Sequence, residues 1–354
     1  LTETSAFFTP RNALVLLDLW KRINEVEDPG VRQKLRFAFT AILPRASRRY
    51  QWSAKRPLNA QNQTYYISPV HFEWNVFDLF TRKVRAVMRA QAFIEEQRDP
   101  LFKGPSSFTY RLASANNIAH LDDCSVSYVF TDPPFGSNIF YSDMNLFQEA
   151  WLGSTTDNSH EAVIHTGGKQ KAKAAEKYEE IIAGACKEAF RVLKPGGYMS
   201  LVFGNSRGSV WSMVQRGLQA SGFQKSPVHL ALLDKGQRSV KGLASGREGV
   251  VTVDLVLTVR KPDVVANGKE VMSASPAPTI TLIRDALKKL PPEKARNPSY
   301  VYVGAVKEAV IRNMPVDDLH LSDVLVALTQ AGYSVDPKTG LLNVPADADA
   351  LSST

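Results

Sequence analysis

Short apolar runs alternate with amphipathic segments between residues 108 and 262, and this alternation limits the possible folds more than any other feature. Strands are expected at 108–113, 125–131, 198–203, 228–233 and 250–259. Helices are expected between them at 178–193 and 209–220, where apolar residues recur with a helical period. Such alternation predicts an α/β fold with a mostly parallel sheet that is covered by helices.

The flanking segments are expected to be mainly helical. Before the α/β region, helices are predicted at 12–23, 31–43 and 74–97, and after it at 279–290, 302–313 and 321–331. Between the α/β region and the last three helices, the chain is rich in proline, serine and alanine, which is typical of a linker. We therefore predict four parts: a helical N-terminal part (1–107), an α/β core (108–262), a linker (263–278) and a small α-rich, winged-helix-like module (279–354).

Composition restricts the class of protein. The chain has 354 residues, 44% of them hydrophobic, which suffices for a sizeable core. No apolar stretch approaches the roughly 20 residues that span a bilayer, and the first residues lack the pattern of a signal peptide. Two cysteines, Cys124 and Cys186, are too few for a disulfide framework. We expect a cytoplasmic protein that has no membrane partner.

The net charge is +8, since 43 lysines and arginines exceed 35 acidic residues. A basic surface attracts polyanions such as nucleic acids. An ordinary solvated surface explains the same excess of positive charge equally well. Net charge alone therefore does not indicate a nucleic-acid partner.

One short motif indicates chemistry. The apolar run 126–130 leads into Asp132-Pro133-Pro134-Phe135-Gly136, and ligands of open parallel sheets bind beyond the carboxyl ends of the strands. The Asp132 carboxylate and the Pro133 carbonyl could accept both N–H bonds of an amino group on a planar base. Phe135 could stack on that base, and Gly136 leaves room for it. The alternative is a plain turn that ends the strand.

Cations alternate with aromatic residues in a second segment. Cations grip phosphates and aromatic rings stack on bases, so this pattern predicts nucleic-acid binding. A surface loop with aromatic residues packed beneath it is the alternative interpretation. The candidate residues are Arg45, Arg48, Arg49, Tyr50, Trp52, Lys55 and Arg56, with Arg238 and Lys241 added from a later basic stretch.

These segments resemble a known family. Residues 130–141 resemble motif IV of the amino-methyltransferases, whereas 149–153 and the Pro-Gly-Gly turn at 195–197 are similar to bacterial site-specific DNA methylases. The resemblance extends over roughly residues 7–262. It implies a Rossmann-like, S-adenosylmethionine-dependent methyltransferase sheet and methylation of adenine N6 or cytosine N4 in DNA, the reaction of restriction–modification systems. Such enzymes flip the target base out of the duplex.

The resemblance also implies site residues. Asp132, Pro133, Pro134 and Phe135 would form the target-amine site. Ser114, which stands where relatives often carry an acid, would contact the methyl donor together with Thr131 and Asp132. Tyr141 would line the pocket of the flipped base, although packing in the core would explain it equally well.

One element of the family is not in the sequence. No Asp-x-Phe-x-Gly-x-Gly loop occurs that could cradle the methionine part of S-adenosylmethionine. We therefore expect the natural chain to be longer, with this loop in an N-terminal part.

Other functions remain open or are disfavoured. RNA could replace DNA as the substrate, with methylation at adenine N6 or guanine N2, and a non-catalytic nucleic-acid-binding remnant is a third possibility. Neither cysteine follows a proline, as methylation at carbon 5 would need, and the sequence has no Cys-x-x-Cys for a zinc deaminase. The six histidines show no ligand spacing, so no metal is expected. The sequence does not indicate the oligomeric state.

Overall fold

The chain divides into two compact units. The computed structural model describes residues 4–52, 54, 59–60, 67–97, 108–136, 141–164, 171–223, 227–234, 251–263, 278–336 and 339–345. One unit comprises Leu1–Tyr110 and Ile139–Glu161, and the other comprises Arg111–Asn138 and Ala162–Thr354. The four-part subdivision stays a prediction.

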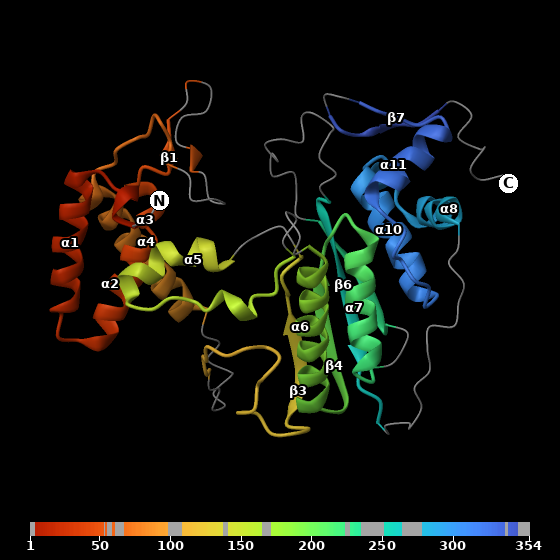
Figure 1. Cartoon of the computed structure of the whole chain (residues 1–354), viewed down its shortest axis with the longest axis horizontal. Helices are drawn as coiled ribbons and strands as arrows, with labels where there is room; N and C mark the ends of the chain where they lie inside the picture. The colour runs from red at the N-terminus through yellow and green to blue at the C-terminus, as the bar shows by residue number, and fades with distance from the viewer. Residues whose placement is uncertain are drawn as a thin grey trace. The chain divides into compact units, whose positions relative to one another are not determined.

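The first unit is helical (Figure 1). Its elements are η1 (Thr4–Phe7), α1 (Pro10–Asn24), α2 (Pro29–Thr40), α3 (Leu43–Ala46), β1 (Tyr50–Gln51), β2 (Asn59–Ala60), α4 (Val76–Glu96), α5 (Tyr141–Leu152) and η2 (Asn158–His160). The helices predicted at 12–23, 31–43 and 74–97 correspond to α1, α2 and α4. Helix α2 ends at Thr40, and Pro44 lies in the first turn of α3, where proline is well tolerated.

Aromatic side chains form the core of the helical unit. Phe147 of α5 stacks on Phe8, with ring centroids 5.2 Å apart, and the Arg49 guanidinium lies 5.2 Å from the Phe147 ring centroid. Trp151 meets Phe39 edge to face at 5.0 Å. Such pairs stabilise packing beyond the area that they bury. Residues 141–152 therefore belong to the same core as the N-terminal helices.

Capping residues determine where these helices begin. Thr9 accepts a hydrogen bond from the Asn12 amide, and Pro10 occupies the first turn of α1. The buried Asn12 side chain donates to the carbonyls of Ala46 and Trp74 at 3.0 and 3.2 Å. Asn12 thus ties α1 to α3 and to the segment before α4.

The second unit contains a four-stranded mixed sheet in the order β3-β4-β6-β5. The strands are β3 (Val126–Thr131), β4 (Leu193–Phe203), β5 (His229–Asp234) and β6 (Val253–Arg260). β3 and β4 are parallel, but β6 is antiparallel to both of its neighbours. The sheet is therefore mixed: β3, β4 and β5 point the same way, as a mostly parallel sheet requires, and β6 is reversed. No helix was expected between 228–233 and 250–259, and strands joined without a crossover helix can pair antiparallel.

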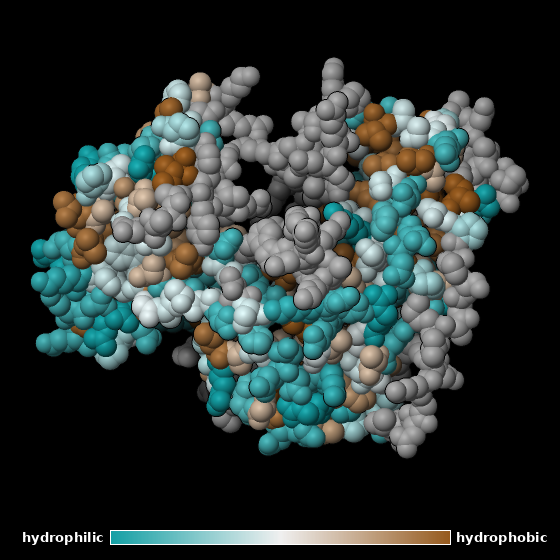
Figure 2. All heavy atoms as spheres, in the orientation of Figure 1, coloured by the Kyte–Doolittle hydropathy of each residue, from teal (hydrophilic) through white to brown (hydrophobic). Residues whose placement is uncertain are grey.

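Two helices pack together beside the sheet, α6 (Lys171–Val192) and α7 (Gly208–Ala220). The Phe203 ring of β4 meets the Trp211 ring of α7 edge to face at 4.8 Å. Glu176, Lys177, Glu180 and Lys187 of α6 are exposed. Hydrophilic side chains accordingly dominate the outer side of this helix in Figure 2.

The C-terminal helices share one hydrophobic core with the sheet. They are α8 (Thr279–Lys289), α9 (Pro292–Ala295), α10 (Pro298–Ile311) and α11 (Leu321–Gln330). Helix α10 is buried around most of its circumference and contacts α8, α11 and β6. A short antiparallel hairpin, β7 (Ser334–Val335) with β8 (Leu342–Asn343), follows α11. Residues 279–343 are therefore packed as part of the α/β unit.

The predicted strand at 108–113 does not form. These residues have no regular secondary structure, and Phe108, Tyr110 and Leu112 are 91%, 79% and 93% exposed. Alternating apolar residues favour a strand only where a neighbouring strand supplies hydrogen bonds, and the strand pairings of the described residues leave this segment out. None of the described helices combines the length and apolarity that crossing a bilayer requires.

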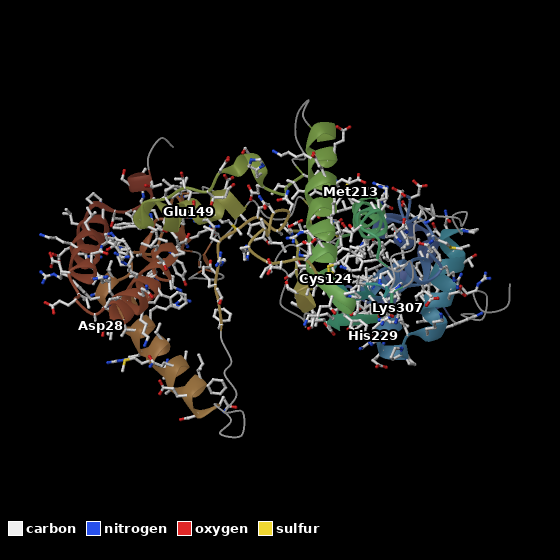
Figure 3. The ribbon with its side chains drawn as sticks, turned by 90° about the horizontal axis from the view of Figure 1, so that it is seen from below. Asp28, Cys124, Glu149, Met213, His229 and Lys307 are labelled. Carbon is white, nitrogen blue, oxygen red and sulfur yellow. The ribbon has the colours of Figure 1, made fainter. Side chains whose placement is uncertain are left out.

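Lys261 fastens the end of α6 to the sheet. Its buried ammonium donates to the carbonyls of Phe190 and Leu193, both at 2.7 Å, and lies 4.6 Å from the Phe190 ring centroid. Cys124 is beside the same helix end, where its amide donates to the Arg191 carbonyl (Figure 3). A cation at a helix C-terminus is also favoured by the helix dipole.

We expect Lys261→Met to lower the free energy of unfolding by about 2–3 kcal/mol, because two buried carbonyls lose their donor. Denaturant titration measures this change. The matched control is Lys194→Met, since Lys194 is exposed at the start of β4 and should change stability by less than about 0.5 kcal/mol. Equal stability of the two variants would show that the Lys261 bonds contribute nothing.

Candidate functional site

The motif at 132–136 follows the carboxyl end of β3, at the edge of the sheet where the parallel strand β4 also ends. Asp132 is exposed, residues 133–135 are half-buried and Gly136 is buried. Gly136 has φ +89°, a conformation that favours glycine. The backbone therefore turns at Gly136 in a conformation that few other residues adopt.

Three successive carbonyls of this turn are bound by protein donors. The Tyr178 hydroxyl of α6 donates to the Pro134 carbonyl at 2.6 Å. The Asn205 side-chain amide donates to the Phe135 carbonyl at 2.6 Å, and the Ile164 amide donates to the Gly136 carbonyl at 3.3 Å. The turn is consequently fixed from three separate parts of the chain.

The buried Tyr178 is a dependable donor. Its side chain is 0% exposed, and burial raises the pKa of its hydroxyl far above the usual value because a buried phenolate would lose its hydration. The hydroxyl therefore stays protonated at physiological pH and keeps donating.

Asn205 lies in the loop between β4 and α7, where both its side chain and its backbone carbonyl are hydrogen-bonded. Its side-chain oxygen accepts from the Arg207 amide at 2.8 Å, and its carbonyl accepts from the Trp211 indole at 3.1 Å. The next part of this loop is tied to the C-terminal helices, because the Gly208 amide donates to His320 Nδ1 at 3.0 Å. The loop is thus bonded to the motif, to α7 and to the residue that precedes α11.

The Phe135 ring packs against the core rather than standing in solvent. It meets the Phe203 ring edge to face with centroids 5.2 Å apart. This contact fixes the ring beside Asp132. Stacking of Phe135 on a base stays a prediction.

The residues predicted to contact the methyl donor are in two places. Thr131 is half-buried and pairs with Leu201 across the parallel strands, next to Asp132. Ser114 is exposed in the segment before β3, where its hydroxyl bonds the Asn116 side chain and its carbonyl accepts from the Asn117 amide. The contacts of Ser114 are therefore local, and its role stays a prediction.

The basic and aromatic segment belongs to the helical unit, and only some of its described residues face solvent. Tyr50 is 4% exposed and Arg49 is 5% exposed, so both serve the packing of the unit in this conformation. Arg48 is half-buried and donates to the Ala6 carbonyl at 3.4 Å. Arg45 is exposed above the Tyr50 ring, and Trp52 is 46% exposed. Among the described members of the segment, Arg45 and Trp52 are thus the exposed ones.

The remaining candidates are distributed as follows. Tyr141 begins α5 in the helical unit and is 44% exposed. Lys55, Arg56, Arg238 and Lys241 lie outside the described residues. Nucleic-acid binding by all of these residues stays a prediction.

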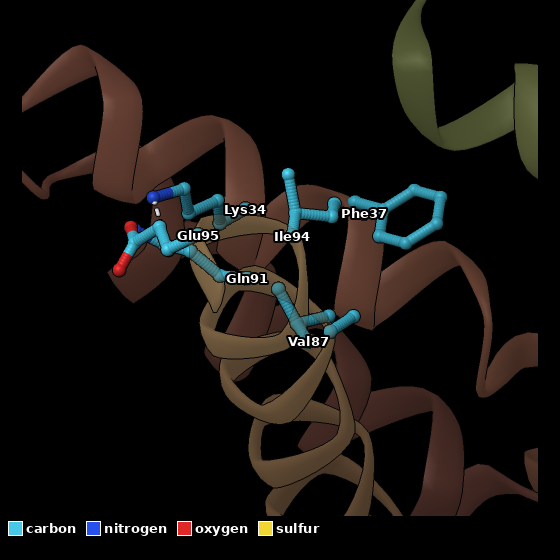
Figure 4. A pocket seen from close by; sticks show the side chains of 7 residues that line it. Lys34, Phe37, Val87, Gln91, Ile94 and Glu95 are labelled. Carbon is cyan, nitrogen blue, oxygen red and sulfur yellow. Dashed lines mark hydrogen bonds between the residues drawn. The ribbon is translucent and has the colours of Figure 1, made fainter. Parts of the chain in front are cut away.

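Neither of the two cavities described here includes the motif at 132–136, and no metal site is found beside it among the described residues. A groove of about 410 Å³ between α2 and α4 is lined by residues such as Lys34, Phe37 and Ile94 (Figure 4). A second cavity, about 290 Å³, lies beside α8, α10 and Leu232. Motif residues line neither cavity. Within the described ranges, no three His, Cys, Asp or Glu side chains are grouped as a metal would require.

Sequence reasoning did not identify Tyr178 and Asn205. Tyr178 occupies an apolar position of a helical pattern, so its hydroxyl gave no separate signal. Asn205 stands between Gly204 and Ser206 in a loop that matches no cofactor motif. A small polar residue just beyond the end of a buried strand, at the edge where the motif also lies, was the available signal.

Comparison with known proteins gives limited similarity. No protein-family model and no curated protein matches the chain. Among solved structures, TTHA0409 of Thermus thermophilus, named as a candidate DNA modification methylase, is similar in its complex with S-adenosyl-L-methionine. The identity is 16%, the match covers 52% of this chain and 60% of TTHA0409, and the TM-score is 0.28.

Two further solved structures give similar values. A selenomethionine derivative of TTHA0409 shows 18% identity over 51% of this chain and 59% of that chain, with a TM-score of 0.27. The [4+2]-cyclase SpnF shows 12% identity over 52% and 63%, with a TM-score of 0.23. The chain spans about three fifths of the length of the solved structures that it matches.

Proposed function

We propose that the protein is an S-adenosylmethionine-dependent methyltransferase that methylates an exocyclic amine of a DNA base, adenine N6 or cytosine N4. The observation that carries this proposal is the arrangement of residues 132–136. An exposed carboxylate follows a strand end, and the turn behind it is fixed by buried donors. A plain turn would not need such anchoring.

The proposed chemistry starts from the amine. Its lone pair is delocalised into the ring, so it becomes nucleophilic only when its nitrogen turns towards tetrahedral geometry. The Asp132 carboxylate and the Pro133 carbonyl would each accept one N–H bond and so favour that geometry. Bound S-adenosylmethionine would supply an electrophilic methyl group.

The residues present fit the donor only in part. Thr131 and Asp132 place polar groups at the strand end, where hydroxyl or amino substituents of the donor could be bound. The glycine-rich turn expected for the methionine part does not occur in the sequence. We therefore assign no residue to that part of the donor.

Two structural interpretations belong to the same proposal. We infer that β3, β4, β5 and β6 form part of a Rossmann-like methyltransferase sheet. We infer that α8–α11 with the β7–β8 hairpin form a winged-helix-like arrangement, because helices followed by a small antiparallel hairpin have that composition. Arg45, Trp52 and Tyr141 are the exposed candidates for contacting DNA among the described residues.

The test is transfer of a labelled methyl group from S-adenosylmethionine. The protein is incubated with duplex DNA in one reaction and with transfer or ribosomal RNA in another. We expect label in DNA. Label in RNA alone would favour the RNA methyltransferase, and nucleic-acid binding without any transfer would favour the non-catalytic alternative.

A further inference from the structure

Two buried polar side chains reach the motif from distant parts of the sequence. Tyr178 is 44 residues from Pro134, and Asn205 is 70 residues from Phe135. Their exposed fractions are 0% and 7%. Both hydrogen bonds measure 2.6 Å, and both end on carbonyls of residues that follow the proposed acceptor, Pro133.

Core packing alone does not explain these side chains. Phenylalanine would fill the site of Tyr178 without bringing a hydroxyl that must find a partner when buried. Asn205 satisfies both of its side-chain groups inside the protein, one on Phe135 and one on Arg207. Buried polar groups of this kind fix one backbone conformation.

The two hydrogen bonds also constrain the orientation of Pro133, because the backbone connects it to Pro134 and Phe135. Each peptide unit is planar, and the ring of Pro134 fixes its φ angle. When Tyr178 and Asn205 hold the carbonyls of Pro134 and Phe135, the orientation of the peptide unit between Pro133 and Pro134 follows from them. Among the described residues, no group donates a hydrogen bond to the Pro133 carbonyl.

We propose that Tyr178 and Asn205 are positioning residues, which act through the backbone of Pro134 and Phe135 to aim the Pro133 carbonyl at the target amine. This inference rests on the proposed methyl transfer. It predicts that the two side chains affect the rate of the chemical step more than the binding of either substrate, because misplacing a catalytic group by about 1 Å can reduce a rate about 100-fold.

The experiment measures steady-state methyl transfer to DNA for Tyr178→Phe and Asn205→Asp. Each substitution removes one donor and nearly preserves shape. We expect kcat to fall about 10- to 100-fold in each variant with little change in KM for DNA or for the methyl donor. The kcat of Asn205→Asp should partly recover as pH falls, because a protonated carboxyl group can again donate to the Phe135 carbonyl.

The matched control is Tyr302→Phe. Tyr302 is equally buried, at 0% exposed, but its hydroxyl makes no hydrogen bond to residues 132–136. Its kcat should equal that of the parent. Thermal unfolding of each variant identifies any general loss of structure, and Tyr178→Phe keeps the test decisive if Asn205→Asp fails to fold.

The outcomes separate the two proposals. An active parent whose two variants keep its kcat would overturn the positioning role and leave the proposed function intact. A parent that transfers no methyl group to any nucleic acid would overturn the proposed function and, with it, this inference. An equal fall in kcat in the control Tyr302→Phe would also overturn the positioning role of Tyr178 and Asn205.

Discussion

Asp132→Ala is expected to lower methyl transfer by about 100- to 1,000-fold, the usual effect of removing one preorganised group that stabilises a transition state. The carboxylate is one of the two acceptors proposed to hold the target amine. Because Asp132 is exposed, its removal should leave the folded state nearly unchanged. Nucleic-acid affinity should also change little, because a single carboxylate contributes nothing to the attraction of phosphates.

The matched control for this variant is Asp122→Ala. Asp122 is also exposed, but it precedes the amino end of β3, at the opposite end of the strand from Asp132. We expect parent activity for it. Initial rates of label transfer at saturating DNA measure both variants. Similar rates for Asp132→Ala and the parent would remove Asp132 from the chemistry.

Gly208→Ala is expected to lower the free energy of unfolding by about 3 kcal/mol, at the upper end of overpacking effects. An added Cβ would lie 1.8 Å from the Val316 carbonyl oxygen and 2.6 Å from the Leu319 carbonyl oxygen. Both are backbone atoms, which cannot move aside like the end of a flexible side chain. The start of α7 and the segment before α11 would have to separate.

Gly30→Ala provides the comparison for this substitution. Gly30 is also in the first turn of a helix, but an added Cβ would meet only the Asp28 side chain, at 3.2 Å. We expect a small change in stability or a slight gain, because alanine is the better helix former. Chemical denaturation measures both variants. An equally small effect at Gly208 would contradict the tight packing of residues 316–319 against α7.

Much of the secondary structure could be predicted from local pattern. Strand β3 starts at Val126 and ends at Thr131, close to the expected 125–131, because an apolar run and the following prolines define it. Helix α10 begins at Pro298, four residues before the expected start at 302. The signal was Asn297-Pro298, a capping residue followed by proline in the first turn.

Tertiary context decided what local pattern could not. Residues 108–113 have the alternation of a strand but lack a pairing partner among the described residues. The antiparallel direction of β6 depends on how β5 and β6 connect, which periodicity does not encode. The burial of α10 around most of its circumference reflects helices on several sides of it.

In the candidate site, too, sequence could indicate some residues, whereas only the fold reveals the others. Asp132 and the prolines that follow it could be found because they are contiguous in the sequence. In the described structure Asp132 is exposed to solvent and directly follows strand β3. Tyr178 and Asn205 could not be found, because only the fold brings them to residues that are 44 and 70 positions away. Nor could sequence indicate that Tyr50 is buried while Trp52 is exposed.

The most direct test of the proposed function is the identity of the methylated product. Duplex DNA treated with the protein and S-adenosylmethionine is digested to nucleosides, which are analysed by mass spectrometry. We expect N6-methyl-2′-deoxyadenosine or N4-methyl-2′-deoxycytidine, absent when Asp132→Ala replaces the parent. Methylation only at cytosine carbon 5, or an amine product that persists in Asp132→Ala, would contradict the role assigned to residues 132–135.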